Sequence, residues 1–196
     1  MKLFYSSTSP YARKVRIAAL EKNIALELET VVAADNPPVL HAANPSGKVP
    51  ALVTDNGEPL AESGHICLYF DMLQPKPRLL PADAAAALPI LRRDALAIGM
   101  MDASVRHVFE TRRAPELQST MWLERHINAI LRTLSVLEKE KFGADFTLDQ
   151  VTLAASLGYL DLRFAQLNWK EKHPALAAWF TKISERPSVK ETVPVA

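Results

Sequence analysis

The pair Glu62-Ser63 combines two side chains that suit the two ends of an α-amino acid. A helix is expected to begin at Ser63, and a helix N-terminus presents free N–H groups and about half a positive charge, so it binds a carboxylate readily. The Ser63 hydroxyl adds a donor for that carboxylate, and the Glu62 carboxylate can accept a hydrogen bond from an ammonium group. Taken alone, the pair has a simpler explanation, a capping serine that follows a surface glutamate.

Pro50 stands directly before an apolar segment, 51–54, that is expected to form a strand. Proline cannot donate to a strand ladder, so it requires a special geometry at this position. A cis Val49–Pro50 bond would supply a tight turn there, and that turn would leave the N–H and carbonyl of Val49 facing outward. An extended peptide ligand could then pair with Val49 as a short neighbouring strand does. The alternative for this isolated motif is an ordinary trans proline in a loop.

The segment Ser9-Pro10-Tyr11-Ala12 lies in the first strand-to-helix turn and resembles the Cys-Pro-Tyr-Cys motif of glutaredoxins with both thiols absent. Dithiol exchange needs an attacking thiolate and a resolving thiol, so a redox role is disfavoured. The Ser9 hydroxyl can instead donate a hydrogen bond to the thiolate of a ligand, and a helix N-terminus lowers the pKa of a nearby thiol. Such a thiol becomes an available nucleophile. Alternative hydroxyl groups stand nearby, on Tyr5, Ser6, Ser7 and Thr8.

The elements that must position these residues alternate between strand and helix over the first eighty residues. An apolar strand at 3–5 precedes a helix from Ser9-Pro10 to about Lys22, because serine caps a helix start and proline suits the first helical position. Residues 26–30 alternate in polarity and predict a strand. A loop with Pro37-Pro38 follows, then a hairpin of 51–54 and 58–61 turning at Asp55-Asn56-Gly57. The order is βαβ followed by ββα.

The stretch 74–81 contains three prolines and cannot be the interior of a helix. Beyond it the sequence is rich in good helix formers, with helices expected near 83–112, 116–140, 148–167 and 174–185. Thr147 and Gln150 fit a capping box at the start of the third of these. We therefore expect one domain at 1–75, a linker at 76–82 and an all-helical domain at 83–196.

Composition and charge disfavour several classes of function. The chain has 196 residues, 23 basic and 22 acidic, so its net charge of +1 offers no basic surface for nucleic acid. The single cysteine, Cys67, excludes an intrachain disulfide, and the spacing of the five histidines predicts no metal site. No window approaches the length of a membrane span, and we expect a reduced, cytoplasmic setting without membrane partners.

Together the three motifs resemble the glutathione transferase superfamily. The resemblance covers nearly the whole chain and includes 44–50, Glu62-Ser63, 146–151, 173–179 and 186–189. It implies an α/β thioredoxin-like N-terminal domain, an all-α helical-bundle C-terminal domain and a homodimer. It implies glutathione as co-substrate, no metal, and a glutathione S-transferase reaction in which the thiolate attacks a small hydrophobic electrophile.

The resemblance also implies roles for individual residues. Val49 would pair with the cysteinyl backbone of glutathione, Glu62 and Ser63 would hold the γ-glutamyl end, and Ser9 would activate the sulfur. Lys48 would face the glycine carboxylate, with a solvated surface lysine as the alternative. The implied glutathione-binding set is Ser9, Lys48, Val49, Pro50, Glu62 and Ser63.

The electrophile would lie against the second domain. Candidates for its pocket are Tyr11, Met101, Val105 and Arg106, with core methionines and a surface arginine as the simpler explanation. Asp102 is expected to make a structural hydrogen bond, with contact to the γ-glutamyl amine, across the dimer, as the alternative. Other reactions on the same fold stay open: a glutathione-dependent isomerase, since Ser6-Ser7-Thr8-Ser9 loosely resembles the serine-rich loop of maleylacetoacetate isomerases, a peroxidase, or a non-catalytic protein-binding partner.

Overall fold

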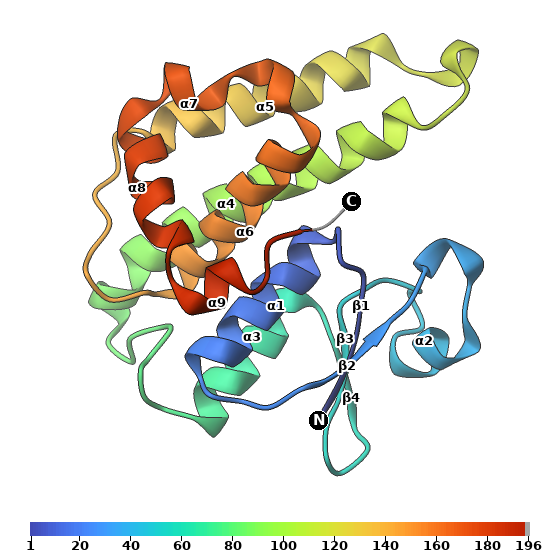
Figure 1. Ribbon diagram of the computed structural model, residues 1–196, viewed down its shortest axis with the longest axis vertical. Helices are drawn as coiled ribbons and strands as arrows, with labels where there is room; N and C mark the ends of the chain where they lie inside the picture. Colours follow the sequence, from blue (N-terminus) through green and yellow to red (C-terminus); the bar gives the residue numbers. More distant parts are fainter. Residues whose placement is uncertain (195–196) are drawn as a thin grey trace.

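The computed structural model describes residues 1–194, so the last two residues of the predicted 83–196 domain lie outside it. A small mixed four-stranded sheet with three helices forms the N-terminal domain, and helices alone form the C-terminal domain (Figure 1). The elements of the N-terminal domain are β1 (Lys2–Tyr5), α1 (Pro10–Glu21), β2 (Glu27–Thr30), a 3-10 turn η1 (Ala33–Asp35), α2 (Pro38–Ala43), β3 (Ala51–Val53), β4 (Pro59–Ala61) and α3 (Ser63–Leu73).

The sheet has the strand order β2-β1-β3-β4. β1 runs parallel to β2, as a βαβ unit requires, and antiparallel to β3, which forms a hairpin with β4. Helices α1 and α3 cover one face through a core cluster that includes Leu3, Ile17 and Phe70. Helix α2 covers the other face, where Phe4 and Leu40 are buried.

Helix α2 corrects the expectation of a plain loop around Pro37-Pro38. Pro38 is the first residue of this helix, a position where proline loses no helical hydrogen bond because the first N–H groups of a helix are unpaired anyway. Leu40 and Ala43 then supply a short apolar face that packs on the sheet. The helix is six residues long, which is too short for its periodicity to stand out in the sequence.

The C-terminal domain is built around α6 (Leu148–Arg163), in which every residue from 148 to 160 is buried. The long helix α4 (Ala84–Thr111) packs against both α6 and α5 (Thr120–Leu137). The remaining elements are η2 (Pro115–Leu117), η3 (Ala165–Leu167), α7 (Trp169–Lys172), α8 (Pro174–Ser184) and α9 (Pro187–Lys190). Within residues 1–194, none of the helices has the length and apolar character needed to span a membrane.

Buried charges join the two domains. The Lys14 ammonium on α1 lies 3.3 Å from the carboxylate of Asp94 on α4, and that carboxylate also accepts a hydrogen bond from the Thr152 hydroxyl on α6. A second buried pair lies within the N-terminal domain, near the connection to the next, where the Lys22 ammonium at the end of α1 binds the Asp71 carboxylate on α3. Because a buried charge is costly without a partner, these pairs fix the position of α1 against the helices behind it.

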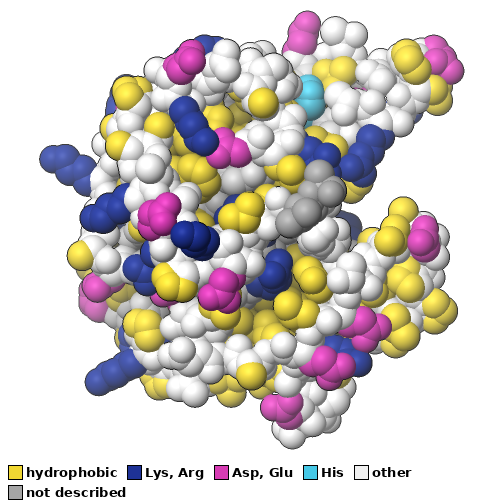
Figure 2. Space-filling view, in the orientation of Figure 1, with side chains coloured by type: hydrophobic (Ala, Val, Ile, Leu, Met, Phe, Trp, Pro, Cys, Tyr) yellow, Lys and Arg dark blue, Asp and Glu magenta, His cyan; other side chains and the backbone are white. Residues whose placement is uncertain are grey.

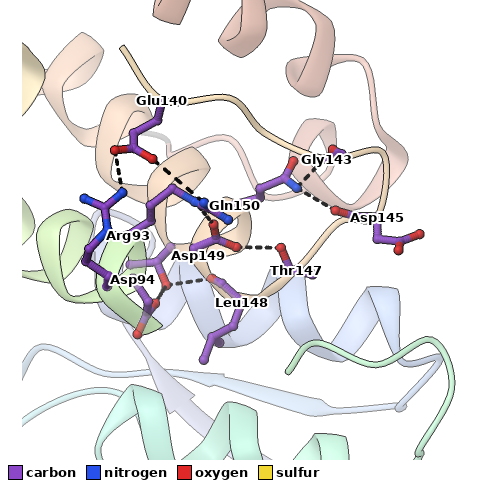
Figure 3. Close-up of polar contacts among 11 residues, drawn as sticks. Arg93, Asp94, Glu140, Gly143, Asp145, Thr147, Leu148, Asp149 and Gln150 are labelled. Atoms are coloured by element: carbon purple, nitrogen blue, oxygen red, sulfur yellow. Dashed lines mark hydrogen bonds and ion pairs between the residues drawn. The ribbon is translucent and has the colours of Figure 1, made fainter. Parts of the chain in front are cut away.

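The start of α6 differs from the expected capping box (Figure 3). The Thr147 hydroxyl donates to the carboxylate of Asp149 at 2.5 Å, and Asp149 is also paired with Arg93 at 2.6 Å. The Gln150 amide does not return to the cap but donates to the carbonyls of Gly143 at 3.3 Å and Asp145 at 2.5 Å. The Thr147 and Gln150 side chains therefore bind a buried carboxylate and two loop carbonyls instead of the N–H groups at the start of the helix.

Candidate functional site

Three loops converge because the sheet register aligns the ends of three adjacent strands. Ala51, the first residue of β3, lies opposite Phe4 of β1 and opposite Ala61 of β4. The chain that follows β1, the chain that precedes β3 and the chain that follows β4 therefore meet at one end of three adjacent strands, which are spaced about 4.8 Å apart. In Figure 1 this end of the sheet faces the C-terminal helices.

The loop before β3 presents an unpaired piece of backbone. The Val49–Pro50 bond is cis, so of the two geometries open for this proline the structure has the tight turn. Within the described part of the chain, neither the N–H nor the carbonyl of Val49 forms a backbone hydrogen bond. Lys48 is exposed beside it. The backbone of Val49 can therefore pair with an extended peptide as it would with an added strand.

Asn44 holds that loop in place, a role that the sequence did not reveal. Its side chain is buried, its amide donates to the carbonyl of Lys48 at 2.8 Å, and its Oδ1 accepts from the N–H and the hydroxyl of Ser46 at 3.1 and 2.8 Å. Gly47 adopts a φ of 66°, a left-handed conformation that favours glycine. The sequence signal for this turn was the presence of Asn44, Ser46 and Gly47 shortly before Lys48, because Asn, Ser and Gly are typical turn residues.

The Glu62-Ser63 corner caps α3 differently from the expectation of a serine cap. Glu62 is the N-cap residue, and its Oε2 accepts the N–H of Gly64 at 3.0 Å. The buried Ser63 hydroxyl donates to Glu62 Oε1 at 3.4 Å. Glu62 has a φ of 74°, a conformation that non-glycine residues rarely adopt and that concentrates at ligand-binding positions. An exposed carboxylate and a buried hydroxyl thus share one helix N-terminus.

Ser9 is the N-cap of α1, and its Oγ accepts the N–H of Ala12 at 3.2 Å. A hydroxyl that accepts the cap bond keeps its own proton for donation to a further acceptor. The alternative hydroxyls are placed differently: Tyr5 packs against the core with the Arg16 guanidinium 5.1 Å above its ring, and the Ser6 and Thr8 hydroxyls lie 3.4 Å apart. Ser9 is the one that stands at the helix N-terminus.

Tyr11 connects α1 to the wall formed by α4. Its phenol donates to the Asp102 carboxylate at 2.5 Å, which is the structural hydrogen bond expected of Asp102. Burial, and then the Asp102 charge, raise the pKa of Tyr11 far above its usual range, so the phenol stays protonated. Figure 2 shows the molecule hollowed between the arm of α4 and α5 and the N-terminal domain.

The other residues predicted for the electrophile pocket are placed unequally. Arg106 is exposed one helical turn beyond Asp102, and Val105 is partly buried against the core of the C-terminal domain. Met101 is fully buried and packs in the core shared by both domains, so it offers no surface to a ligand. Met101 and Arg106 both lie in α4, but residues five positions apart in a helix point in different directions, so the two side chains do not share a face.

Cys67 has no part in this site. It is fully buried in α3, and burial raises the pKa of its thiol to about 12. A thiol in such surroundings is not ionised near neutral pH and is unreactive. Among residues 1–194, no group of His, Cys, Asp and Glu side chains is arranged to hold a metal ion.

Comparison with known proteins gives consistent results. The model for the N-terminal domain of glutathione S-transferases matches residues 3–78, and the model for the C-terminal domain matches residues 120–182. An uncharacterized GST-like protein of Escherichia coli K12, YibF, is 36% identical, with 99% of this chain and 98% of that protein covered.

Two solved structures are similar over their whole length. A glutathione S-transferase from Methylobacillus flagellatus KT with glutathione bound has a TM-score of 0.92 at 38% identity, with 99% of both chains covered. A glutathione transferase family member from Pseudomonas fluorescens Pf-5 with bound S-(propanoic acid)-glutathione has a TM-score of 0.89 at 39% identity, again with 99% of both chains covered.

Proposed function

Because the chain belongs to the glutathione transferase superfamily, we propose that it is a glutathione S-transferase that conjugates the glutathione thiolate to small electrophiles. The observation that carries the proposal is the convergence of three loops at one end of the sheet. These loops carry the unpaired backbone of Val49, the Glu62-Ser63 corner and the Ser9 hydroxyl. The relative from Methylobacillus flagellatus, which was solved with glutathione bound, supports the same ligand.

Each part of the tripeptide has a matching group in this proposal. The cysteinyl backbone pairs with the N–H and carbonyl of Val49, which are otherwise unpaired within residues 1–194. The γ-glutamyl carboxylate takes the Ser63 hydroxyl and the N–H groups at the start of α3, and its ammonium takes the Glu62 carboxylate. The exposed Lys48 ammonium faces the glycine carboxylate at the rim. Pro50 fixes the turn that aims Val49 at the ligand.

Ser9 supplies the chemistry. The Ser9 hydroxyl donates a hydrogen bond to the thiolate sulfur. Together with the N-terminus of α1, this hydrogen bond lowers the pKa of the bound thiol. The thiol proton leaves to solvent, and the thiolate sulfur forms a bond to the electrophilic carbon, which lies between this end of the sheet and α4. With an aryl halide such as a chlorodinitrobenzene, the carbon–chlorine bond breaks and chloride leaves to solvent; with an activated alkene, the carbon–carbon π bond breaks and the neighbouring carbon takes a proton from solvent. The Pseudomonas fluorescens relative with bound S-(propanoic acid)-glutathione supports a cleft with room for a substituent on sulfur.

Calorimetric titration with glutathione, followed by conjugation of a chlorodinitrobenzene, tests the proposal. Ser9→Ala and Ser119→Ala form a matched pair, because both serines cap a helix and each cap contributes about 1 kcal/mol to stability. We expect only Ser9→Ala to raise the pKa of the bound thiol, by roughly one to two units, since a hydrogen bond to a charged group contributes about 1.5–3 kcal/mol. Absence of binding at millimolar glutathione would refute the proposal.

The proposal extends to the assembly and setting of the protein. We infer a homodimer in a reduced, cytoplasmic compartment, where it serves detoxification. The resemblance implies the dimer, and exposed apolar side chains on α3 and α4 are surface that the association of two copies would bury. They are Met72, Leu73, Leu88 and Leu91. Light scattering coupled to size-exclusion chromatography tests this inference, and a monomeric mass at micromolar concentration would contradict it.

A further inference from the structure

Three arginines on or directly after α4 and α6 lack a negative partner. Within residues 1–194, no carboxylate lies within 4.0 Å of the guanidinium of Arg106, Arg112 or Arg163, whereas the neighbouring Arg113 is paired with Glu110. The Nε of Arg163 is in addition buried without any hydrogen-bond partner among the described residues. A buried donor without an acceptor is uncommon in a native protein and requires an explanation.

These arginines lie around two tyrosines, Tyr11 on α1 and the buried Tyr159 on α6. Arg106 follows Asp102 by one turn of α4, so the two side chains lie on the same face of that helix. In the same way, Arg163 follows Tyr159 by one turn of α6 and lies on its face. The Asp102 carboxylate holds the Tyr11 phenol at 2.5 Å. This contact brings that face of α4 to the first turn of α1, which Ser9 caps.

Helix α6 reaches the same turn of α1. A β-carbon at Gly158 would lie 1.8 Å from the Arg13 guanidinium, so the residue next to Tyr159 is in direct contact with α1. Burial raises the pKa of both phenols, Tyr11 and Tyr159. The nearby positive charges oppose this rise: Arg106 acts on Tyr11, and Arg112 and Arg163 act on Tyr159. The arginines therefore border one region.

Positive charges outnumber negative ones among the described groups that act on the two phenols. Asp102 keeps its negative charge while it accepts the hydrogen bond of the neutral Tyr11 phenol, and it stands against the three guanidinium groups. Figure 2 shows Lys and Arg side chains on the underside of the α4–α5 arm, where it overhangs the hollow. A cleft that is lined by one sign of charge attracts ligands of the opposite sign. Guanidinium groups are also the side chains that best match a carboxylate in geometry.

We propose that the electrophile accepted by this cleft carries a carboxylate, which Arg106 and Arg163 bind. The inference rests on the proposed function, because it describes the second substrate of the same reaction. The arginines of α4 and α6 hold the carboxylate of the electrophile, and its electrophilic carbon then faces the glutathione sulfur beside Ser9. Arg112 adds to the positive potential at the rim.

Two glutathione thioethers that differ only in charge test this inference by calorimetric titration. They are S-(para-carboxybenzyl)glutathione and S-(para-carbamoylbenzyl)glutathione. We expect the acid to bind at least about tenfold more tightly than the amide, since a hydrogen bond to a charged group contributes enough free energy for one such factor. We expect Arg106→Gln and Arg163→Gln each to reduce this ratio by about tenfold and to leave the affinity for the amide unchanged.

Arg78→Gln is the matched control. Arg78 is exposed and has no ion pair among the described residues, but it precedes the N-terminus of α4, about 30 Å of helix away from Arg106. Its substitution leaves the ratio unchanged. Arg106 is exposed, so Arg106→Gln tests the inference even if Arg163→Gln fails to fold.

Equal affinity for acid and amide in the unmodified chain overturns the inference. An acid preference that Arg106→Gln leaves intact, or that Arg78→Gln reduces equally, overturns it as well. Titration with glutathione itself separates these outcomes from failure of the proposed function. If glutathione binds and both thioethers bind equally, only the charge selection is wrong; if neither glutathione nor either thioether binds, the proposed function is wrong and this inference falls with it.

Discussion

Gly158 is the point at which α6 touches a buried charge on α1, and its substitution is a direct test of how the domains are joined. A β-carbon at Gly158 would lie 1.8 Å from Nη1 of Arg13 and 3.0 Å from its Cζ. Arg13 is only 4% exposed, and its guanidinium donates to the carbonyls of Val189 at 3.1 Å and Ala154 at 3.5 Å. Gly158→Ala can therefore be accommodated only if the guanidinium leaves these acceptors.

The cost follows from those two hydrogen bonds. A bond that involves a charged group contributes about 1.5–3 kcal/mol, so losing both bonds, of which the one from the colliding Nη1 to Ala154 is the longer and weaker, costs about 3–4 kcal/mol. Alanine is more favourable than glycine in a helix by about 1 kcal/mol, which offsets part of the loss. We expect a net destabilisation of about 2–3 kcal/mol, which for a chain of this length lowers Tm by roughly 5–10 °C.

Urea denaturation and scanning calorimetry measure the effect, with Gly99→Ala as the matched control. Gly99 lies in α4, and a β-carbon there would meet no atom within 4 Å, so this change should stabilise the chain by up to about 1 kcal/mol. In an Arg13→Met background, Gly158→Ala should lose most of its cost, because the colliding guanidinium is gone. The reasoning is refuted if Gly158→Ala is as stable as Gly99→Ala, or if its cost is the same with and without Arg13.

Three other changes have definite expected outcomes. Asp71→Ala leaves the buried Lys22 ammonium without a carboxylate, and we expect a loss of about 3–5 kcal/mol in urea denaturation; a loss below 1 kcal/mol would contradict the buried pair. Gln150→Asp removes both donors to the loop carbonyls, so it should destabilise by about 1–3 kcal/mol, whereas a capping box would make it stabilising. Burial lowers the pKa of His107 and of His126 below the ordinary 6.5, so the unfolded chain binds more protons and stability is lost as pH falls below about 6.5. The fall in Tm between neutral and mildly acidic pH should shrink in a variant with both histidines changed to glutamine, and an unchanged fall would contradict this assignment.

Local rules were sufficient for most elements of the fold. The cap at Ser9, the turn at 55–57 and the helix at Ser63 follow from residues that lie within a few positions of each other, and the structure contains α1, the β3–β4 hairpin and α3 at those places. The division into 1–75, 76–82 and 83–196 stays a prediction. In the structure, α3 ends at Leu73 and α4 begins at Ala84.

The failures share a physical cause, which is competition from distant or buried partners. Thr147 and Gln150 have the types of a capping box, but a buried carboxylate and loop carbonyls take their hydrogen bonds instead. Met101 was a pocket candidate through the resemblance, with a core methionine as the simpler explanation, and the packing of both domains buries it. The contact of Arg13 with Gly158 joins positions 145 residues apart, and no local pattern reports such a pair.

The same long-range contacts determine where the proposed site can act. Ser9 caps α1, and three of the next five residues bind the C-terminal domain: Tyr11 and Lys14 reach carboxylates on α4, and Arg13 reaches the carbonyls of α6 and α9. The position of the Ser9 hydroxyl is therefore set by the helices opposite it as well as by the sheet that carries it. An isolated N-terminal domain would keep the sheet register that gathers Val49 and Glu62, but it would leave two charges and a phenol on α1 without their partners. The loss would fall on the thiol-activating end of the site, while the end that binds the tripeptide backbone would be preserved.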